Sequence, residues 1–219
     1  ATLTHLGPGL GNGLANLHNA KKARTPMVNV IGDHATYHRK YDAPLTSDVE
    51  GVARPMSNWI RVSQTADSVG YDGAEAVQAA LSPPGQIASL ILPADTAWSL
   101  TSAVANPKEP LKPKGADHQV VMEVAKVLKR DSNVVFLING FLSEGRMSQL
   151  GKISKKTGAK IIGDTFVART ERGAGRVEAQ RLPYCGEQAS EVLAGTTNLV
   201  LVSSQPPVTF FAYPDKPNW

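Results

Sequence analysis

The sequence predicts an α/β fold made of two three-layer domains with mainly parallel sheets. Short, continuously apolar runs alternate with longer segments of helical periodicity along the chain. Apolar runs of this kind are typical of strands that are buried on both faces of a parallel sheet. A proline-rich segment without periodicity, residues 101–116, separates the two sets of elements. The alternation implies right-handed β–α–β crossovers within each domain.

The first region, residues 1–100, predicts the order β-α-β-α-β-α-β. Leu14, Leu17 and Ala20 form one apolar stripe of a helix. Cationic residues follow in its last turn, and Pro26 closes it. Strands are expected at residues 1–4, 27–31, 59–62 and 87–92, and helices at residues 14–24, after Ser47, and at 65–81 with Val69, Ala76, Val77 and Ala80 towards the core.

Four glycines occupy alternate positions between the first strand and the first helix, at Gly7, Gly9, Gly11 and Gly13. This spacing predicts a tight turn, because glycine accepts positive φ and lets a ligand come close. The N–H groups of the following helix would favour an anionic or electron-rich partner. The dinucleotide fingerprint G-x-G-x-x-G is absent. Counted from Gly7, its third glycine position is Asn12, and counted from Gly9 it is Leu14. No lysine precedes Lys21, which excludes a phosphate loop.

A polar loop, residues 33–47, follows the buried strand at 27–31 and contains His34 and His38. Ligands gather at such strand ends in open α/β sheets, and a loop of this length is more often functional than idle. A metal site is not expected, because no helix and no H-E-x-x-H pattern accompanies the two histidines. Surface and substrate-channel roles both remain open for them.

The second region, residues 117–219, follows the linker at 101–116, whose spaced prolines predict a stiff, extended connector. Its segment 165–181 carries several arginines and is expected to be either a solvated surface or an anion or nucleotide site. No G-x-G-x-x-G pattern accompanies it, so FAD is not expected and the region is interpreted as structural. Strands are predicted at 133–138, 159–162, 199–203 and 208–212, and helices at 117–130, 143–157 and 186–194.

The composition of the chain argues against nucleic-acid binding and against a membrane-spanning helix. The net charge is +4 and no block of five basic residues occurs, which argues against nucleic-acid binding. No apolar run approaches the about 20 residues of a membrane helix. The single cysteine, Cys185, cannot form an internal disulfide and is expected in the core of a cytoplasmic protein.

The stretch His5-Leu6-Gly7-Pro8-Gly9-Leu10-Gly11-Asn12 resembles the pyrimidine-binding domain of thiamine-diphosphate (ThDP) enzymes of the acetolactate synthase and benzoylformate decarboxylase group. In that family a strand ends in Gly-Pro-Gly, or in a His-led variant ending Gly-x-Gly-Asn. The likeness continues through residues 16–20, 24–28, 30–34, 83–86 and 90–95. The second region resembles the Rossmann-like middle domain of the family and is expected to be incomplete.

The resemblance implies a homodimer or homotetramer that binds ThDP and Mg²⁺ between subunits and acts on a small-molecule 2-oxo acid. Decarboxylation and carboligation both remain open, because Gly-Pro-Gly is synthase-like whereas the leading histidine is decarboxylase-like. The family's catalytic glutamate is expected before Ala1, and its Gly-Asp-Gly metal motif does not occur in this chain. We therefore expect a fragment of a longer enzyme that is inactive alone.

The candidate site residues come from the same resemblance. His5 matches an active-site histidine of the decarboxylase branch and suits proton transfer near neutral pH, although a hydrogen-bonded structural histidine is the alternative. The family places loop 33–47 over the active centre, which adds His34 and His38 as catalytic candidates. Gly7, Gly9 and Asn12 are the cofactor-binding candidates.

Two other classes of function are alternatives to this interpretation. A non-catalytic two-domain α/β binding or scaffold protein would use the glycines for packing only. An NAD-linked enzyme is disfavoured by the failed fingerprint.

Overall fold

The computed structural model describes residues 1–140 and 142–219, which form two compact units, Ala1–Pro113 and Lys114–Trp219. Each unit has a four-stranded sheet in which the described neighbouring strands run parallel. The predicted α/β class with mainly parallel sheets is confirmed. None of the described helices is long and apolar enough to cross a membrane.

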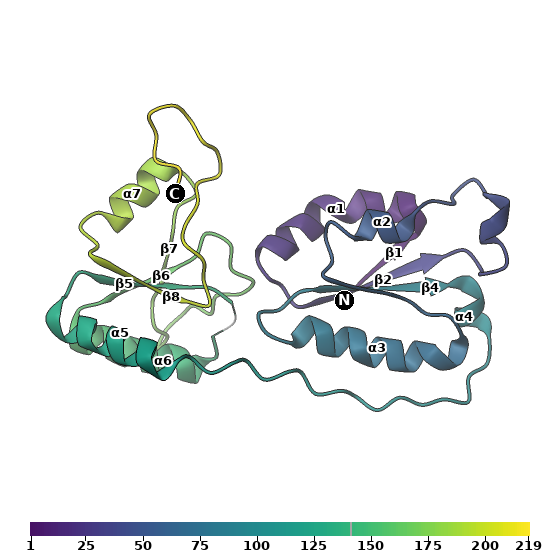
Figure 1. Ribbon diagram of the computed structural model, residues 1–219, viewed down its shortest axis with the longest axis horizontal. Helices are drawn as coiled ribbons and strands as arrows, with labels where there is room; N and C mark the ends of the chain where they lie inside the picture. The colour runs from purple at the N-terminus through teal and green to yellow at the C-terminus, as the bar shows by residue number, and fades with distance from the viewer. Residues whose placement is uncertain (141) are drawn as a thin grey trace. The chain divides into compact units, whose positions relative to one another are not determined.

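In the first unit, helices cover both faces of the sheet (Figure 1). The strand order is β1 (Thr2–His5), β2 (Met27–Asp33), β4 (Ile87–Pro93) and β3 (Trp59–Val62). Helices α1 (Leu6–Lys22) and α2 (Val49–Ala53) lie on one face, and α3 (Ala66–Leu81) lies on the other. A 3₁₀ turn η1 (Arg39–Tyr41) interrupts loop 33–47, and α4 (Ala94–Trp98) follows β4.

Helix α1 corrects the prediction for residues 7–13, because it starts at Leu6 and contains all four glycines. The bend between strand and helix lies at Leu6 itself, which has a φ of 54°. Leu10 and Leu17 are buried against the sheet, Leu14 packs beside them, and Leu6 is also buried. This stripe at helical spacing outweighs the helix-weakening effect of glycine, which is about 0.5–1 kcal/mol per residue.

Helix α3 packs through small side chains on the opposite face of the sheet. Ala76 and Ala80 are fully buried against Ala88 and Leu90 of β4. The prediction that Val77 also faces the core is wrong, since its side chain is 45% exposed. The alanine pair therefore provides the contact surface of this helix, and a capping box at Thr65 starts it.

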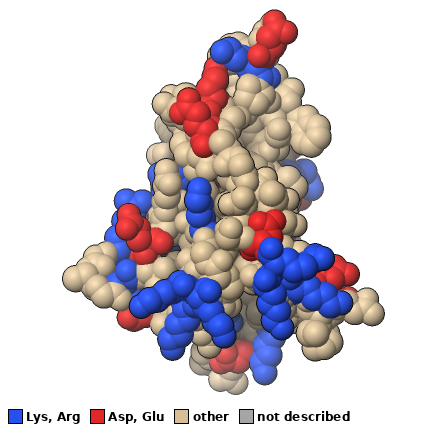
Figure 2. Space-filling view, turned by 90° about the vertical axis from the view of Figure 1, so that its left-hand side faces the viewer, with Lys and Arg blue, Asp and Glu red and all other residues tan. Residues whose placement is uncertain are grey.

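The second unit has the strand order β7 (Gln180–Arg181), β6 (Lys160–Gly163), β5 (Val134–Ile138) and β8 (Asn198–Val202). Helices α5 (His118–Arg130) and α6 (Glu144–Thr157) lie on one face and α7 (Gly186–Leu193) on the other (Figure 1). Figure 2 shows Lys and Arg side chains gathered where α5 and α6 end. Cations in these last turns complement the negative ends of the helix dipoles.

Three predictions for the second unit are wrong. Residues 208–212 are irregular, and the N–H of Thr209 bonds to the carbonyl of Asn218 instead of a sheet partner. Strand β7 was missed because its two residues are polar and exposed. Cys185 is partly exposed at the start of α7 and does not lie in the core.

The segment that follows Ser99 lies against α3 of the first unit as far as residue 111. The Thr101 hydroxyl donates to Asp67, and Lys108 pairs with Glu75 at 2.5 Å. The N–H of Leu111 donates to the Ser82 hydroxyl at 3.0 Å. These contacts assign this part of the predicted linker to the first unit.

Candidate functional site

The carboxyl ends of β1 and β2 form the candidate site in the first unit. These strands run parallel, and their register places His5 opposite Gly32. Strand β2 ends one residue later at Asp33, and His34 follows directly. The order of the strands therefore brings two of the predicted catalytic histidines to one edge of the sheet.

A glycine on the neighbouring strand makes room for the His5 side chain, whereas Gly9 lies beside it at an ordinary contact distance. A Cβ at Gly32 would lie 2.9 Å from Nδ1 of His5, which is closer than ordinary contact allows. A Cβ at Gly9 would lie 3.7 Å from the His5 Cβ. The imidazole is exposed and makes no hydrogen bond to any of the described residues. It is therefore accessible to a ligand, as a proton-transfer group must be.

The residue after His5 has an unusual backbone. Leu6 combines a φ of 54° with a side chain that is only 2% exposed. A positive φ at a bulky residue costs about 1–3 kcal/mol and persists only where the surrounding structure enforces it. Burial of Leu6 thus holds the abrupt bend that leaves His5 at the edge of the sheet.

The three predicted cofactor-binding residues have different surroundings. Gly9 lies beside His5, as described above. Gly7 is buried, and a Cβ on it would collide with the side chain of Ser47, so its bare face accommodates loop 33–47. Asn12 is exposed on α1, about 10 Å along the helix axis from His5. Of the three, the structure brings only Gly9 next to the predicted catalytic histidine.

Two carboxylates fasten loop 33–47 to the sheet edge. Asp33 binds Arg39 at 2.6 Å and accepts the N–H of His34 at 2.7 Å. Asp95 accepts the hydroxyl and the N–H of Thr36 at 2.6 and 2.9 Å. The Thr36 hydroxyl, followed by its N–H, lowers the pKa of Asp95, and the charge of Arg39 adds to the effect.

Aromatic side chains follow one another along the same loop. The rings of His34 and His38 are 5.4 Å apart in an edge arrangement, and those of His38 and Tyr41 are 5.8 Å apart. His38 and Tyr41 are exposed, whereas His34 is half-buried. Within the described residues, no group of three or more metal-binding side chains forms.

Unpaired polar atoms mark this edge of the sheet. The buried side-chain atoms that lack a hydrogen-bond partner in the described structure are Thr4 Oγ1, His34 Nε2, Arg39 Nε and Thr46 Oγ1. All four belong to β1 or to loop 33–47. An unpaired buried polar group costs about 1–3 kcal/mol and is uncommon in proteins. Their grouping fits a polar ligand or a further polypeptide segment at this edge.

The fold thus defines an α/β protein with a candidate ligand-binding site at the carboxyl ends of parallel strands. No protein-family model matches the chain. A Mycobacterium tuberculosis protein named as an acetolactate synthase large subunit, IlvX, is 48% identical over all 219 residues. Over its whole length the chain is therefore homologous to part of an acetolactate synthase-like protein. It spans 42% of the length of that relative.

Solved structures agree with this fold assignment. A Rhodococcus jostii RHA1 ThDP-dependent 4-hydroxybenzoylformate decarboxylase matches 96% of this chain and 41% of its own, with a TM-score of 0.74 and 18% identity. A thiamin diphosphate-dependent enzyme from Mycobacterium smegmatis matches 97% of this chain and 43% of its own, with a TM-score of 0.68 and 18% identity. At this identity the matches show the fold alone.

Sequence reasoning missed the residues that support the site. Gly32 could be found only from the strand register, and the pairing of Asp95 with Thr36 joins residues 59 positions apart. The Asp33–Arg39 pair left a weak signal, an acid at a strand end and a base six residues later. The sequence carries no signal for the positive φ of Leu6, because a leucine in that position predicts only burial.

Proposed function

We propose that this chain is part of a ThDP-dependent enzyme that decarboxylates or joins 2-oxo acids. The observation that carries the proposal is the exposed His5 imidazole at a sheet edge with four unpaired buried polar atoms. The names of the relatives, an acetolactate synthase and a 4-hydroxybenzoylformate decarboxylase, support the same reaction class.

The residues of the first unit fit one end of the cofactor. His5 would hold or move a proton beside the reacting group, and the absence of a side chain at Gly32 would leave room for its ring. Thr4 and His34 offer polar atoms that still need partners. When bound, ThDP supplies the electron sink for carbanion chemistry.

The diphosphate and Mg²⁺ would be held outside these 219 residues. The chain has no Gly-Asp-Gly motif, and the described residues contain no cluster of metal-binding side chains. We therefore propose that the chain is inactive alone and works in a homodimer or homotetramer of the longer enzyme. A cytoplasmic location fits its single unpaired cysteine.

The test compares His5→Gln with His18→Gln in the intact enzyme, supplied with ThDP and Mg²⁺. His18 is a matched control, because it is an exposed histidine on α1. Loss of a general acid–base group lowers kcat by about 10²–10⁴-fold, so we expect a loss of this size with pyruvate or benzoylformate for His5→Gln only.

The 219-residue chain is measured in parallel and is expected to show no turnover. Turnover by this chain alone would overturn the claim of inactivity. An unchanged kcat in His5→Gln would remove the proposed proton-transfer role.

A further inference from the structure

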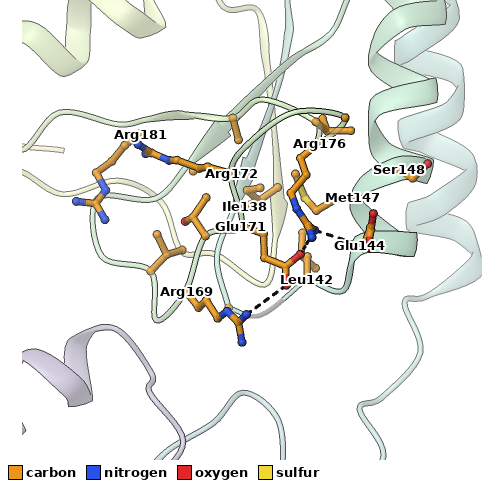
Figure 3. Close-up of a pocket in the computed structure, with 17 residues that line it drawn as sticks. Ile138, Leu142, Glu144, Met147, Ser148, Arg169, Glu171, Arg172, Arg176 and Arg181 are labelled. Carbon is orange, nitrogen blue, oxygen red and sulfur yellow. Dashed lines mark hydrogen bonds and ion pairs between the residues drawn. The ribbon is translucent and has the colours of Figure 1, made fainter.

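The second unit contains a cavity of about 130 Å³ at the carboxyl ends of β5 and β6 (Figure 3). Residues 167–181 and the start of α6 form its walls. The residues that line it belong to the second unit, whereas His5 belongs to the first. Its lining combines an apolar floor with four arginines.

Aliphatic side chains from three elements form the floor. Ile138 ends β5, Met147 lies on the first turns of α6, and Val177 belongs to the loop before β7. These residues belong to the hydrophobic core of the unit or pack against it. An apolar cavity of about 150 Å³ holds a benzene molecule, so this one has room for a body of about four to six carbons.

The arginines divide into a neutralised pair and an uncompensated pair. Arg176 binds Glu171 and lies 3.7 Å from Glu144, and Arg169 lies 3.6 Å from Glu171. Figure 3 shows the Glu171 carboxylate between the Arg169 and Arg176 side chains, and Glu144 on the other side of Arg176. Among the described residues, neither Arg172 nor Arg181 has an ion-pair partner.

We propose that this cavity binds a small aliphatic carboxylate. The hydrocarbon body of about four to six carbons would fill the apolar floor. The carboxylate would pair with Arg172 and Arg181, because a guanidinium donates two parallel hydrogen bonds to such a group. A compact anion without an apolar body would leave the floor unfilled and be bound less tightly.

The test titrates the 219-residue chain with 3-methylbutanoate. Two probes separate the contributions: 3-methylbutan-1-ol keeps the body without the charge, and inorganic phosphate keeps the charge without the body. Binding is followed by calorimetry and by NMR of ¹³C-labelled methionine methyl groups. Met147 lines the cavity, whereas Met122 does not and serves as the internal control.

We expect 3-methylbutanoate to shift the Met147 signal and to bind about tenfold more tightly than either other probe. The alcohol lacks the charge-assisted hydrogen bonds to the arginines, and phosphate lacks the hydrocarbon body that fills the apolar floor. Equal binding of the alcohol or of phosphate would overturn the proposal. Absence of a Met147 shift at saturation would overturn it as well.

Arginine variants test the charged end of the cavity. Arg172→Gln and Arg181→Gln should each weaken 3-methylbutanoate binding about tenfold. Arg146→Gln, an exposed α6 residue outside the cavity, should leave it unchanged. Circular dichroism checks that the variants fold. If a folded double variant of Arg172 and Arg181 binds as tightly as the wild type, the assignment is wrong.

Discussion

Replacing Gly32 by alanine would place a methyl group against the imidazole of His5. The added Cβ would lie 2.9 Å from His5 Nδ1, whereas ordinary contact begins at 3.4 Å. The ring or the strand would therefore have to move by 0.5 Å or more, the difference between 3.4 and 2.9 Å. Gly32 lies in β2 without a positive φ, so alanine introduces no backbone strain there.

The two consequences of Gly32→Ala should differ in size. A misplacement of about 1 Å at a reacting group lowers the rate by about 10²-fold, so kcat of the intact enzyme should fall about 10- to 100-fold. Alanine also reduces the freedom of the unfolded chain by about 0.4–1 kcal/mol, which offsets part of the local clash. The free energy of unfolding should therefore change little.

The assay combines kcat with the NMR signals of His5 in the 219-residue chain. Gly11→Ala is the control, because a Cβ at Gly11 meets nothing within 4 Å. We expect Gly32→Ala to move the His5 ring signals and lower kcat, and Gly11→Ala to do neither. If Gly32→Ala leaves both the ring signals and kcat as they are, Gly32 does not position His5.

Two further predictions concern loop 33–47. Because Thr36 lowers the pKa of Asp95 in the folded state, the stabilising contacts are fully present above the ordinary pKa of 3.8 and are lost as the pH falls through the lower folded value. Asp95→Asn should remove this part of the pH dependence of the free energy of unfolding, measured by urea unfolding at a series of pH values. If the free energy of unfolding changes equally with pH in the variant and the wild type, the prediction is refuted. Gly7→Ala should cost about 1–3 kcal/mol by overpacking against Ser47, and the additional change Ser47→Gly should restore most of the loss.

The fold could be predicted where one periodicity dominated the sequence. Strands β2, β4 and β5 are mainly apolar runs, and α3 has helical spacing. The prediction is wrong at residues 7–13, because burial of the leucine stripe that begins at Leu6 stabilises a helix despite the four glycines. It failed again at 208–212, where aromatic residues pack on one another outside any sheet.

The candidate site was predictable in position but not in its supporting contacts. The end of a buried parallel strand indicated His34, and the family motif indicated His5. The contact between Ser47 and Gly7 joins residues 40 positions apart, so no local pattern reveals it. The arginine-rich segment 165–181 has two open interpretations from sequence, and the cavity that it lines is where we propose carboxylate binding.

A crystal structure of the intact enzyme with ThDP and Mg²⁺ tests the central claim most directly. The account predicts the aminopyrimidine ring beside His5 and Gly9, with new hydrogen-bond partners for Thr4 and His34. A cofactor bound elsewhere, with His5 facing neither a cleft nor a subunit contact, would contradict it.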